Sequence, residues 1–235
     1  MIRCVIFDID NTLYSYTRAN AAAMQGLYAY AGEWLGLSAS EFDQLAAKAS
    51  KRISNRLSAD NATIHNRLIR FQNILEDLGL PLHPHAMKMY DRYWDTFLDN
   101  MECAPDCREL VQKLRKRNIR VGIGTDMTAL MQYRKLEKLD LLPLVQFMVT
   151  SEEAGVEKPD LRFFELCIQK AGCAPEECLF VGDNPKKDIL GAVNAGMKTL
   201  WYNPDGKALP EDVKTACRGI SSYREVINRF DDYLS

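Results

Sequence analysis

Two carboxylates stand one residue apart near the start of the chain, directly after an apolar run. Val5, Ile6 and Phe7 precede Asp8 and Asp10, and such a run is typical of a parallel strand buried on both faces. Carboxylates this close repel each other, so one should be hard to ionise unless a bound cation compensates the charge. A cation bound beside the two carboxylates would remove this problem. The same residues would also suit a polar strand end that caps a helix.

Polar residues that could take part in binding or catalysis occur at three other places in the chain. Thr125 ends "VGIGT", whose glycines let backbone N–H groups approach an anion. Lys158 precedes a proline at a plausible helix start, and Asp183 ends "LFVGD" with Asp188 shortly after it. Taken singly, Thr125 and Asp183 suit helix caps and Lys158 suits a solvated surface charge. Their recurrence in this order, beside predicted strand ends, favours one shared site.

The elements that would position these residues alternate between helix and strand after Pro105. Such alternation indicates a parallel sheet built from βαβ units. Open sheets of this kind bind ligands at the carboxyl ends of their strands. The predicted strands are residues 3–8, 119–125, 145–151, 178–183 and 198–203, and the predicted helices are residues 106–118, 128–140, 160–172 and 185–196.

The segment between the first strand and Pro105 looks helical throughout. Apolar residues recur there at three- and four-residue spacing in four successive stretches, which predicts four amphipathic helices around a shared core. We therefore predict an α/β fold with a Rossmann-like parallel sheet core flanked by helices. Residues 1–14 and 101–235 would form this core, and residues 15–100 would form a four-helix domain inserted after the first strand.

Composition narrows the class of protein. The net charge of −2 gives no reason to expect nucleic acid or an anionic membrane as a partner. No signal peptide is visible, and the longest apolar stretch, residues 141–149, is too short to span a bilayer. Seven cysteines without a CxxC pair favour free thiols in a reducing cytoplasm. Cys103 and Cys107 have the spacing of half a zinc site, but a second ligand pair is missing.

Four segments, "DIDNTL", "GIGTD", "EKPD" and "GDNPKKD", resemble the four motifs of the haloacid dehalogenase-like (HAD) phosphohydrolases. The motif set is complete, its first member has the form DxDxT, and the resemblance covers the whole predicted core. The inserted helices at residues 15–100 look like the type 1 cap of that family.

The resemblance implies a role for each motif residue. Asp8 would be the nucleophile that forms an aspartyl-phosphate, and its ordinary pKa of about 3.9 would leave it ionised. Asp10 would protonate the leaving oxygen and then deprotonate the attacking water. Thr125 would donate a hydrogen bond to a phosphoryl oxygen, and Lys158 would stabilise charge on the transferred group.

The resemblance also implies a bound Mg²⁺, which would bridge protein carboxylates and the phosphoryl group. Its ligands would be the Asp8 carboxylate, the backbone carbonyl of Asp10 and the Asp183 carboxylate. Asp188 would support the site from nearby. This cofactor would explain why Asp8 and Asp10 can stand so close together.

Candidate substrate contacts lie beside the motifs and in the predicted cap. Tyr14 and Arg18 follow the nucleophile closely, Asp126 follows Thr125, and His65 opens the third cap helix. The middle of the cap is basic, with only Asp60 as an acid between residues 44 and 75. These cations would either attract anionic substrates or form a solvated outer helix face. They are Lys48, Lys51, Arg52, Arg56, Arg67 and Arg70.

Taken together, these features predict a Mg²⁺-dependent phosphatase of a small phosphate monoester, such as a nucleoside monophosphate or a sugar phosphate. A sugar-phosphate mutase remains an alternative. A haloacid dehalogenase is disfavoured because its chemistry needs neither a metal nor an acid. Here Asp10 would supply an acid, and Asp183 would supply a metal ligand. A non-catalytic phosphoacceptor or binding module is disfavoured because every chemical position is filled. We expect a small phosphorylated metabolite as partner, no nucleic acid or membrane, and a monomer or homodimer.

Overall fold

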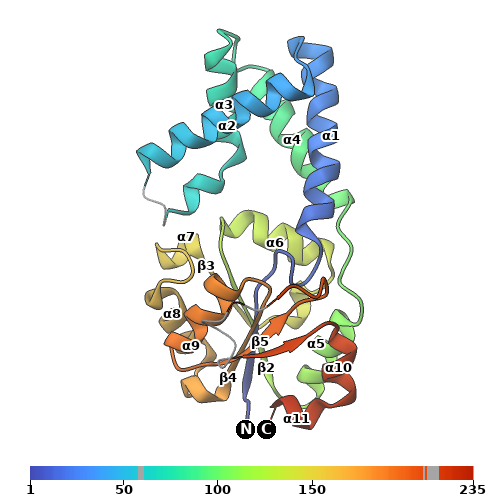
Figure 1. The fold of residues 1–235 in the computed structure, drawn as a ribbon, viewed down its shortest axis with the longest axis vertical. Helices are drawn as coiled ribbons and strands as arrows, with labels where there is room; N and C mark the ends of the chain where they lie inside the picture. Colours follow the sequence, from blue (N-terminus) through green and yellow to red (C-terminus); the bar gives the residue numbers. More distant parts are fainter. Residues whose placement is uncertain (58–60, 209, 211–216, 235) are drawn as a thin grey trace. The chain divides into compact units, whose positions relative to one another are not determined.

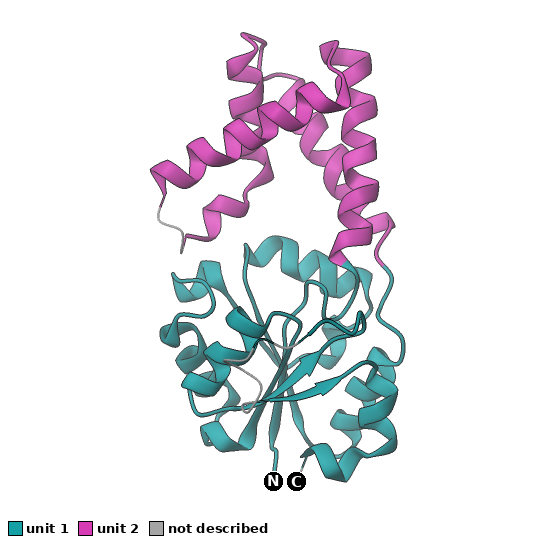
Figure 2. Cartoon of the chain, viewed as in Figure 1, with its two compact units in different colours: residues 1–15, 102–235 teal, residues 16–101 magenta. Residues whose placement is uncertain are grey.

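The computed structural model describes residues 1–57, 61–208, 210 and 217–234. The chain divides into two compact units, of which the first comprises Met1–Ser15 and Glu102–Ser235 and the second Tyr16–Met101 (Figure 2). None of the described helices is both long enough and apolar enough to cross a membrane.

The first unit contains a six-stranded sheet with the order β3-β2-β1-β4-β5-β6, in which every neighbouring pair is parallel (Figure 1). The predicted α/β fold with a parallel sheet is thereby confirmed. The strands are β1 (Cys4–Phe7), β2 (Arg120–Thr125), β3 (Phe147–Thr150), β4 (Cys178–Gly182), β5 (Lys198–Tyr202) and β6 (Arg218–Ile220).

Helices cover both faces of this sheet, as the alternation of side chains along β1 requires. Cys4 and Ile6 belong to a buried apolar cluster that also contains Phe163 and Phe164 of α8. Phe7 instead contacts the ring of Tyr223 in α10. The helical segments of this unit are α5 (Cys107–Lys116), α6 (Ala129–Lys138), η2 (Leu142–Leu144), α7 (Ser151–Ala154), α8 (Leu161–Ala171), η3 (Pro175–Glu177), η4 (Pro185–Leu190), α9 (Gly191–Asn194), α10 (Tyr223–Asn228) and α11 (Phe230–Leu234).

The second unit is helical, as the spacing of its apolar residues predicts. Its core is rich in aromatic side chains, among which Tyr93, Trp94 and Phe97 of α4 meet at ring-centroid distances of 5.0 to 5.8 Å. Such contacts add to the free energy gained by burial of apolar surface. The elements are α1 (Tyr16–Leu35), α2 (Ala39–Arg56), η1 (Ala62–His65), α3 (Arg67–Asp77) and α4 (His85–Asp99).

Candidate active site

The candidate site lies where three adjacent strands end. β1 lies between β2 and β4 in the sheet, and Asp8 follows β1 directly. The Asp8 N–H donates a hydrogen bond to the Val181 carbonyl at 2.9 Å, which extends the parallel pairing by one residue. Thr125 ends β2, and Asp183 follows the last residue of β4. The sheet therefore brings these polar residues, far apart in sequence, to one edge.

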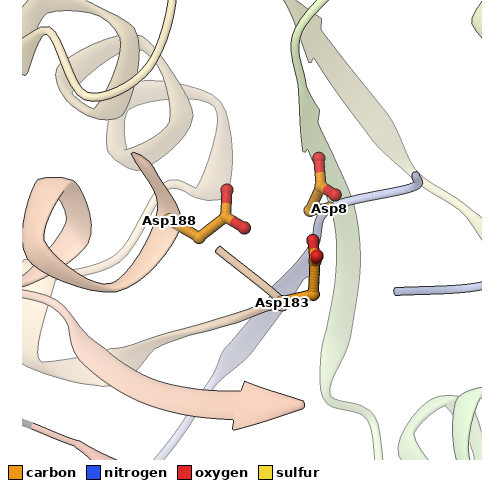
Figure 3. Close-up of side chains that lie close together, drawn as sticks. All are labelled: Asp8, Asp183 and Asp188. Atoms are coloured by element: carbon orange, nitrogen blue, oxygen red, sulfur yellow. The ribbon is translucent and has the colours of Figure 1, made fainter. Parts of the chain in front are cut away.

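Three aspartates gather at this edge (Figure 3). Asp8, Asp183 and Asp188 each offer a carboxylate oxygen, and the three oxygens lie within 4.8 Å of one another. Asp188 reaches the cluster from η4, where its Oδ2 accepts a hydrogen bond from the Asn184 N–H at 2.9 Å. The helical segment η4 thus brings the Asp188 carboxylate back to the end of β4, where Asp183 lies.

Lys158 joins two of these carboxylates. Its buried ammonium donates to Asp8 Oδ1 and Asp188 Oδ1, both at 2.6 Å, and to the Gly124 carbonyl at 3.3 Å. Burial alone would lower the pKa of Lys158, but the charges of Asp188 and Asp8 raise it well above its usual range. Lys158 is therefore a charged group inside the site, and the interpretation of it as a surface charge is wrong.

The cluster contains more carboxylates than ammonium groups, three against the one of Lys158. Burial, together with the nearby Asp188 charge, raises the pKa of Asp183 to about 7. Burial also raises the pKa of Asp8 well above its usual range, although Lys158 opposes the shift. The protein groups alone therefore compensate the negative charge of these carboxylates only in part. Carboxylate oxygens are the ligands that Mg²⁺ and Ca²⁺ prefer, so the donor set and its excess charge fit a divalent cation.

Comparison with known families agrees with this geometry. A family model described as haloacid dehalogenase-like hydrolase matches residues 2–196, a range that contains every residue of the cluster. The chain belongs to the haloacid dehalogenase-like hydrolases.

Individual proteins are similar to this chain over most of their length. The chain is 34% identical to a ribulose-1,5-bisphosphate 5-phosphatase of Halopiger xanaduensis, over 87% of this chain and 86% of the relative. It is 31% identical to a glyceraldehyde 3-phosphate phosphatase of Methanopyrus kandleri, over 85% of this chain and 83% of the relative. A crystal structure of a 2-haloacid dehalogenase of Pseudomonas syringae superposes with a TM-score of 0.78 and 25% identity, over 98% and 100%.

Asp10 has surroundings of its own in this haloacid dehalogenase-like hydrolase. Its carboxylate accepts hydrogen bonds from Lys135 Nζ at 2.7 and 2.9 Å and from the Tyr14 hydroxyl. Burial would raise the pKa of Asp10, but the charge and hydrogen bonds of Lys135 lower it below its ordinary value. Tyr14 is buried and orients Asp10, and its predicted contact with a substrate stays a prediction.

Lys135 itself was missed by sequence reasoning. It lies on α6 and its side chain has no exposed surface. The available signal was its position within the helix, because Lys135 lies on the same side as the buried residues Met131 and Gln132. A lysine on the buried face of an amphipathic helix indicates a buried partner for its charge.

Thr125 and Asp126 play different parts in the structure. Thr125 is buried, and its hydroxyl accepts a hydrogen bond from Gln132 Nε2 at 2.9 Å. The Asp126 carboxylate accepts bonds from the Lys158 N–H at 3.0 Å and from Lys187 Nζ at 2.8 Å. Asp126 therefore holds the segment that carries Lys158, and its predicted contact with a substrate stays a prediction.

Thr12 is a second site residue to which the sequence analysis gave no role. Its hydroxyl donates a hydrogen bond to Asp8 Oδ2 at 3.3 Å, so that Asp8 is held from both oxygens. The form DxDxT contained this signal. Arg18 and His65 belong to the helical unit, Arg18 in the first turn of α1 and His65 at the end of η1. Their contact with a substrate also stays a prediction.

Proposed function

We propose that the protein removes the phosphoryl group of a small sugar phosphate and carries it transiently on Asp8. The chain is a phosphate monoester hydrolase of the haloacid dehalogenase-like family. The observation that carries the mechanism is the buried pair of Asp8 and Lys158, 2.6 Å apart at the carboxyl end of the central strand. The two curated relatives described above are phosphatases of sugar phosphates, and they support this substrate class.

The proposed reaction has two displacements at phosphorus. In the first, an Asp8 carboxylate oxygen bonds to phosphorus while the bond from phosphorus to the sugar oxygen breaks. In the second, water attacks phosphorus, the bond to Asp8 breaks, and inorganic phosphate leaves. The Lys158 ammonium, already within 2.6 Å of Asp8, is placed to balance negative charge on the phosphoryl oxygens in both displacements.

Asp10 is the acid–base residue of this proposal. Its protonated form would donate to the departing sugar oxygen, and its carboxylate would then accept a proton from the attacking water. Lys135 and Tyr14 hold the carboxylate in place and favour the charged form, which is the form that the second displacement uses.

Mg²⁺ is the proposed cofactor. Asp8, Asp183 and the backbone carbonyl of Asp10 would hold it, with Asp188 in support. When bound, such a cation neutralises carboxylate and phosphoryl charge and favours the ionised nucleophile. The excess of carboxylates over ammonium groups in the cluster supports this assignment.

We further infer that the helical unit is a type 1 cap, with residues 1–14 and 101–235 as the catalytic core and 15–100 as the cap. The chain leaves and re-enters the core at adjacent points, because Tyr14 and Cys103 form an isolated antiparallel bridge. The Ala104 N–H also donates to the Leu13 carbonyl at 2.7 Å. Two adjacent crossings can serve as a hinge. A cytoplasmic location is part of the proposal, and the free state of every cysteine supports it.

Phosphate release from a panel of metabolites tests the proposed function. With Mg²⁺, the purified protein should hydrolyse sugar phosphates faster than nucleoside monophosphates, and should leave a folded phosphoprotein almost intact, because a cap admits only small substrates. Chelation of the metal should stop the reaction. Halide release from a 2-haloacid without phosphate release would overturn the proposal, as would conversion of a sugar 1-phosphate to its 6-phosphate without free phosphate.

Replacement of Gly182 by alanine should disturb the proposed metal site without direct loss of a ligand. A methyl group built at Gly182 would lie 2.5 Å from Asp188 Cγ and 2.6 Å from its Cβ, so the Asp188 side chain must move. Displacement by about 1 Å can cost about 100-fold in rate. We expect Gly182→Ala to reduce kcat/KM by this order and to raise the Mg²⁺ concentration needed for half-maximal activity.

Gly32→Ala is the matched control for this substitution. Gly32 lies within α1, and a methyl group there meets its nearest neighbour, the Leu37 carbonyl oxygen, at an ordinary 3.7 Å. Its activity and metal requirement should equal those of the unaltered protein. Equal Mg²⁺ titration curves for the two variants would contradict the assigned role of Asp188.

A further inference from the structure

One helix of the first unit buries two polar side chains that lie one turn apart. Gln132 and Lys135 of α6 have no exposed surface. Polar side chains are seldom buried so completely unless they bind a partner. Lys135 holds the Asp10 carboxylate, which the proposed function uses. The proposed function gives no task to Gln132, so its burial calls for an explanation.

The hydrogen bonds of Gln132 fix the direction in which its amide lies. Its Nε2 donates to the backbone carbonyl of Asp126 at 2.7 Å and to the hydroxyl oxygen of Thr125 at 2.9 Å. A backbone carbonyl can only accept, so the amide atom beside it must be the nitrogen and not the oxygen. The hydroxyl oxygen of Thr125 therefore receives its hydrogen bond from Gln132.

The hydrogen of the Thr125 hydroxyl stays available for another acceptor. A hydroxyl has one hydrogen to donate, and the bond from Gln132 does not use it. The nearby carbonyl oxygen of Asp126 lies 3.3 Å from the hydroxyl oxygen, which is longer than a usual hydrogen bond between two oxygens. An anionic oxygen that enters the site would accept this hydrogen more strongly.

The amide oxygen of Gln132 indicates that this arrangement has a cost. It is buried and has no hydrogen-bond partner within the part of the chain that the structure describes. A buried acceptor without a donor lowers the free energy of unfolding. Departures of this kind from stable packing are expected at functional sites. The position of Gln132 is thus better explained by what its nitrogen holds than by the stability of α6.

Thr125 lies beside the nucleophile of the proposed function. It ends β2, which pairs with β1, and Asp8 follows β1 directly. The Lys158 ammonium contacts Asp8 at 2.6 Å and the carbonyl of Gly124, the residue before Thr125, at 3.3 Å. A phosphoryl group on Asp8 would therefore bring its oxygens close to the end of β2.

We propose that Gln132 is a positioning residue, which holds the oxygen of the Thr125 hydroxyl so that its hydrogen is donated to the phosphoryl group. This inference rests on the proposed function and concerns the first unit alone. The donor is in place before the substrate binds, so it needs no reorganisation when charge develops on the phosphoryl oxygens.

Two substitutions of Gln132 test the inference through phosphate release. Gln132→Met has a similar size but no donor, and we expect kcat to fall about tenfold, as for loss of one hydrogen bond. The change in KM should be less than about threefold, because the bond is stronger in the transition state than in the bound substrate. Gln132→Glu should reduce kcat about 100-fold, because its carboxylate accepts the Thr125 hydrogen and withdraws this donor from the phosphoryl group.

A double variant shows whether Gln132 acts through Thr125. Thr125→Val removes the hydroxyl and should reduce kcat about 100-fold. Addition of Gln132→Met should then cost less than about threefold, because no hydroxyl is left to orient. A small remainder is expected, since Gln132 also makes a hydrogen bond to Asp10. A tenfold loss from Gln132→Met in both backgrounds would indicate an independent structural effect and would overturn the inference.

Gln146→Met is the matched control. The Gln146 side-chain oxygen accepts a hydrogen bond from the Val121 N–H at 2.6 Å, near the opposite end of the same strand β2. Its loss should lower the thermal unfolding midpoint by about 2–4 °C and leave kcat unchanged. A fall in kcat as large as that of Gln132→Met would show that any weakening of β2 impairs catalysis, which would contradict a specific role for Gln132.

The same measurements separate this inference from the proposed function. If the unaltered protein releases phosphate and both Gln132 variants keep its kcat, the role of Gln132 is wrong and the phosphatase proposal stands. If the unaltered protein releases phosphate from none of the sugar phosphates, the phosphatase proposal is wrong, and the role of Gln132 is wrong with it.

Discussion

Asp8→Asn should reduce phosphate release on the order of 10⁴-fold or more, the scale seen when an enzyme loses its nucleophile. The amide keeps the size of the carboxylate but cannot form the bond to phosphorus that the covalent path requires. Lys158 would still be held by Asp188 at 2.6 Å, so its position should be maintained. Steady-state release of phosphate at saturating Mg²⁺ measures the effect.

The fold should survive this change. Burial and the nearby carboxylates raise the pKa of Asp8, which means that its charge is poorly accommodated by the protein groups alone. A neutral amide should therefore leave the thermal unfolding midpoint unchanged or higher. Asp232→Asn, at an exposed carboxylate that pairs with Arg229, serves as control and should keep full activity. Turnover by Asp8→Asn within tenfold of the unaltered protein would exclude the covalent path.

Lys158→Met should impair both catalysis and stability. The ammonium is the shared partner of Asp8 and Asp188, and its loss leaves two buried carboxylates without it. Breaking a buried ion pair on one side typically costs about 3–5 kcal/mol of the free energy of unfolding. Loss of one stabilising donor also costs about 10²- to 10³-fold in kcat. Thermal unfolding with and without Mg²⁺, together with kcat, measures the two effects.

Metal dependence sharpens this second prediction. Because a divalent cation would offset carboxylate charge, Mg²⁺ should raise the unfolding midpoint of Lys158→Met more than that of the unaltered protein. Lys170→Met is the control, since Lys170 pairs with Glu153 at the surface and such pairs contribute little. If Lys158→Met and Lys170→Met unfold at the same temperature and turn over equally, the role assigned to Lys158 is wrong.

The motif residues were predictable because topology decides where they meet. Asp8 and Asp183 follow strands that are direct neighbours, and the carboxyl ends of neighbouring parallel strands share one edge. Periodicity was sufficient to predict five of the strands. It did not reveal β6, because a strand of three residues owes its identity to pairing with β5 rather than to a pattern of its own.

Partners within the site were not predictable in the same way. Lys135 reads as an ordinary charged residue on a helix, and only tertiary packing places its ammonium 2.7 Å from Asp10. Arg67 and Arg70 belong to the same basic segment as Arg52, and only the structure assigns Asp77 to Arg52. Which opposite charge a side chain meets depends on contacts between distant segments, and sequence spacing carries little of that information.

In the sequence, the helical unit is inserted between β1 and β2, which are neighbours in the sheet. This insertion determines the order in which the parts of the chain can fold during synthesis. Cys4 pairs with Arg120 across β1 and β2, so the middle of the sheet cannot form until the ribosome has made the whole helical segment. While the helical segment is being synthesised, the apolar residues of β1 have no partner strand. Exposed strands of this kind are prone to aggregation. Contacts within the helical unit are local by comparison and form quickly. The nascent chain should therefore contain a folded helical unit before it contains a sheet.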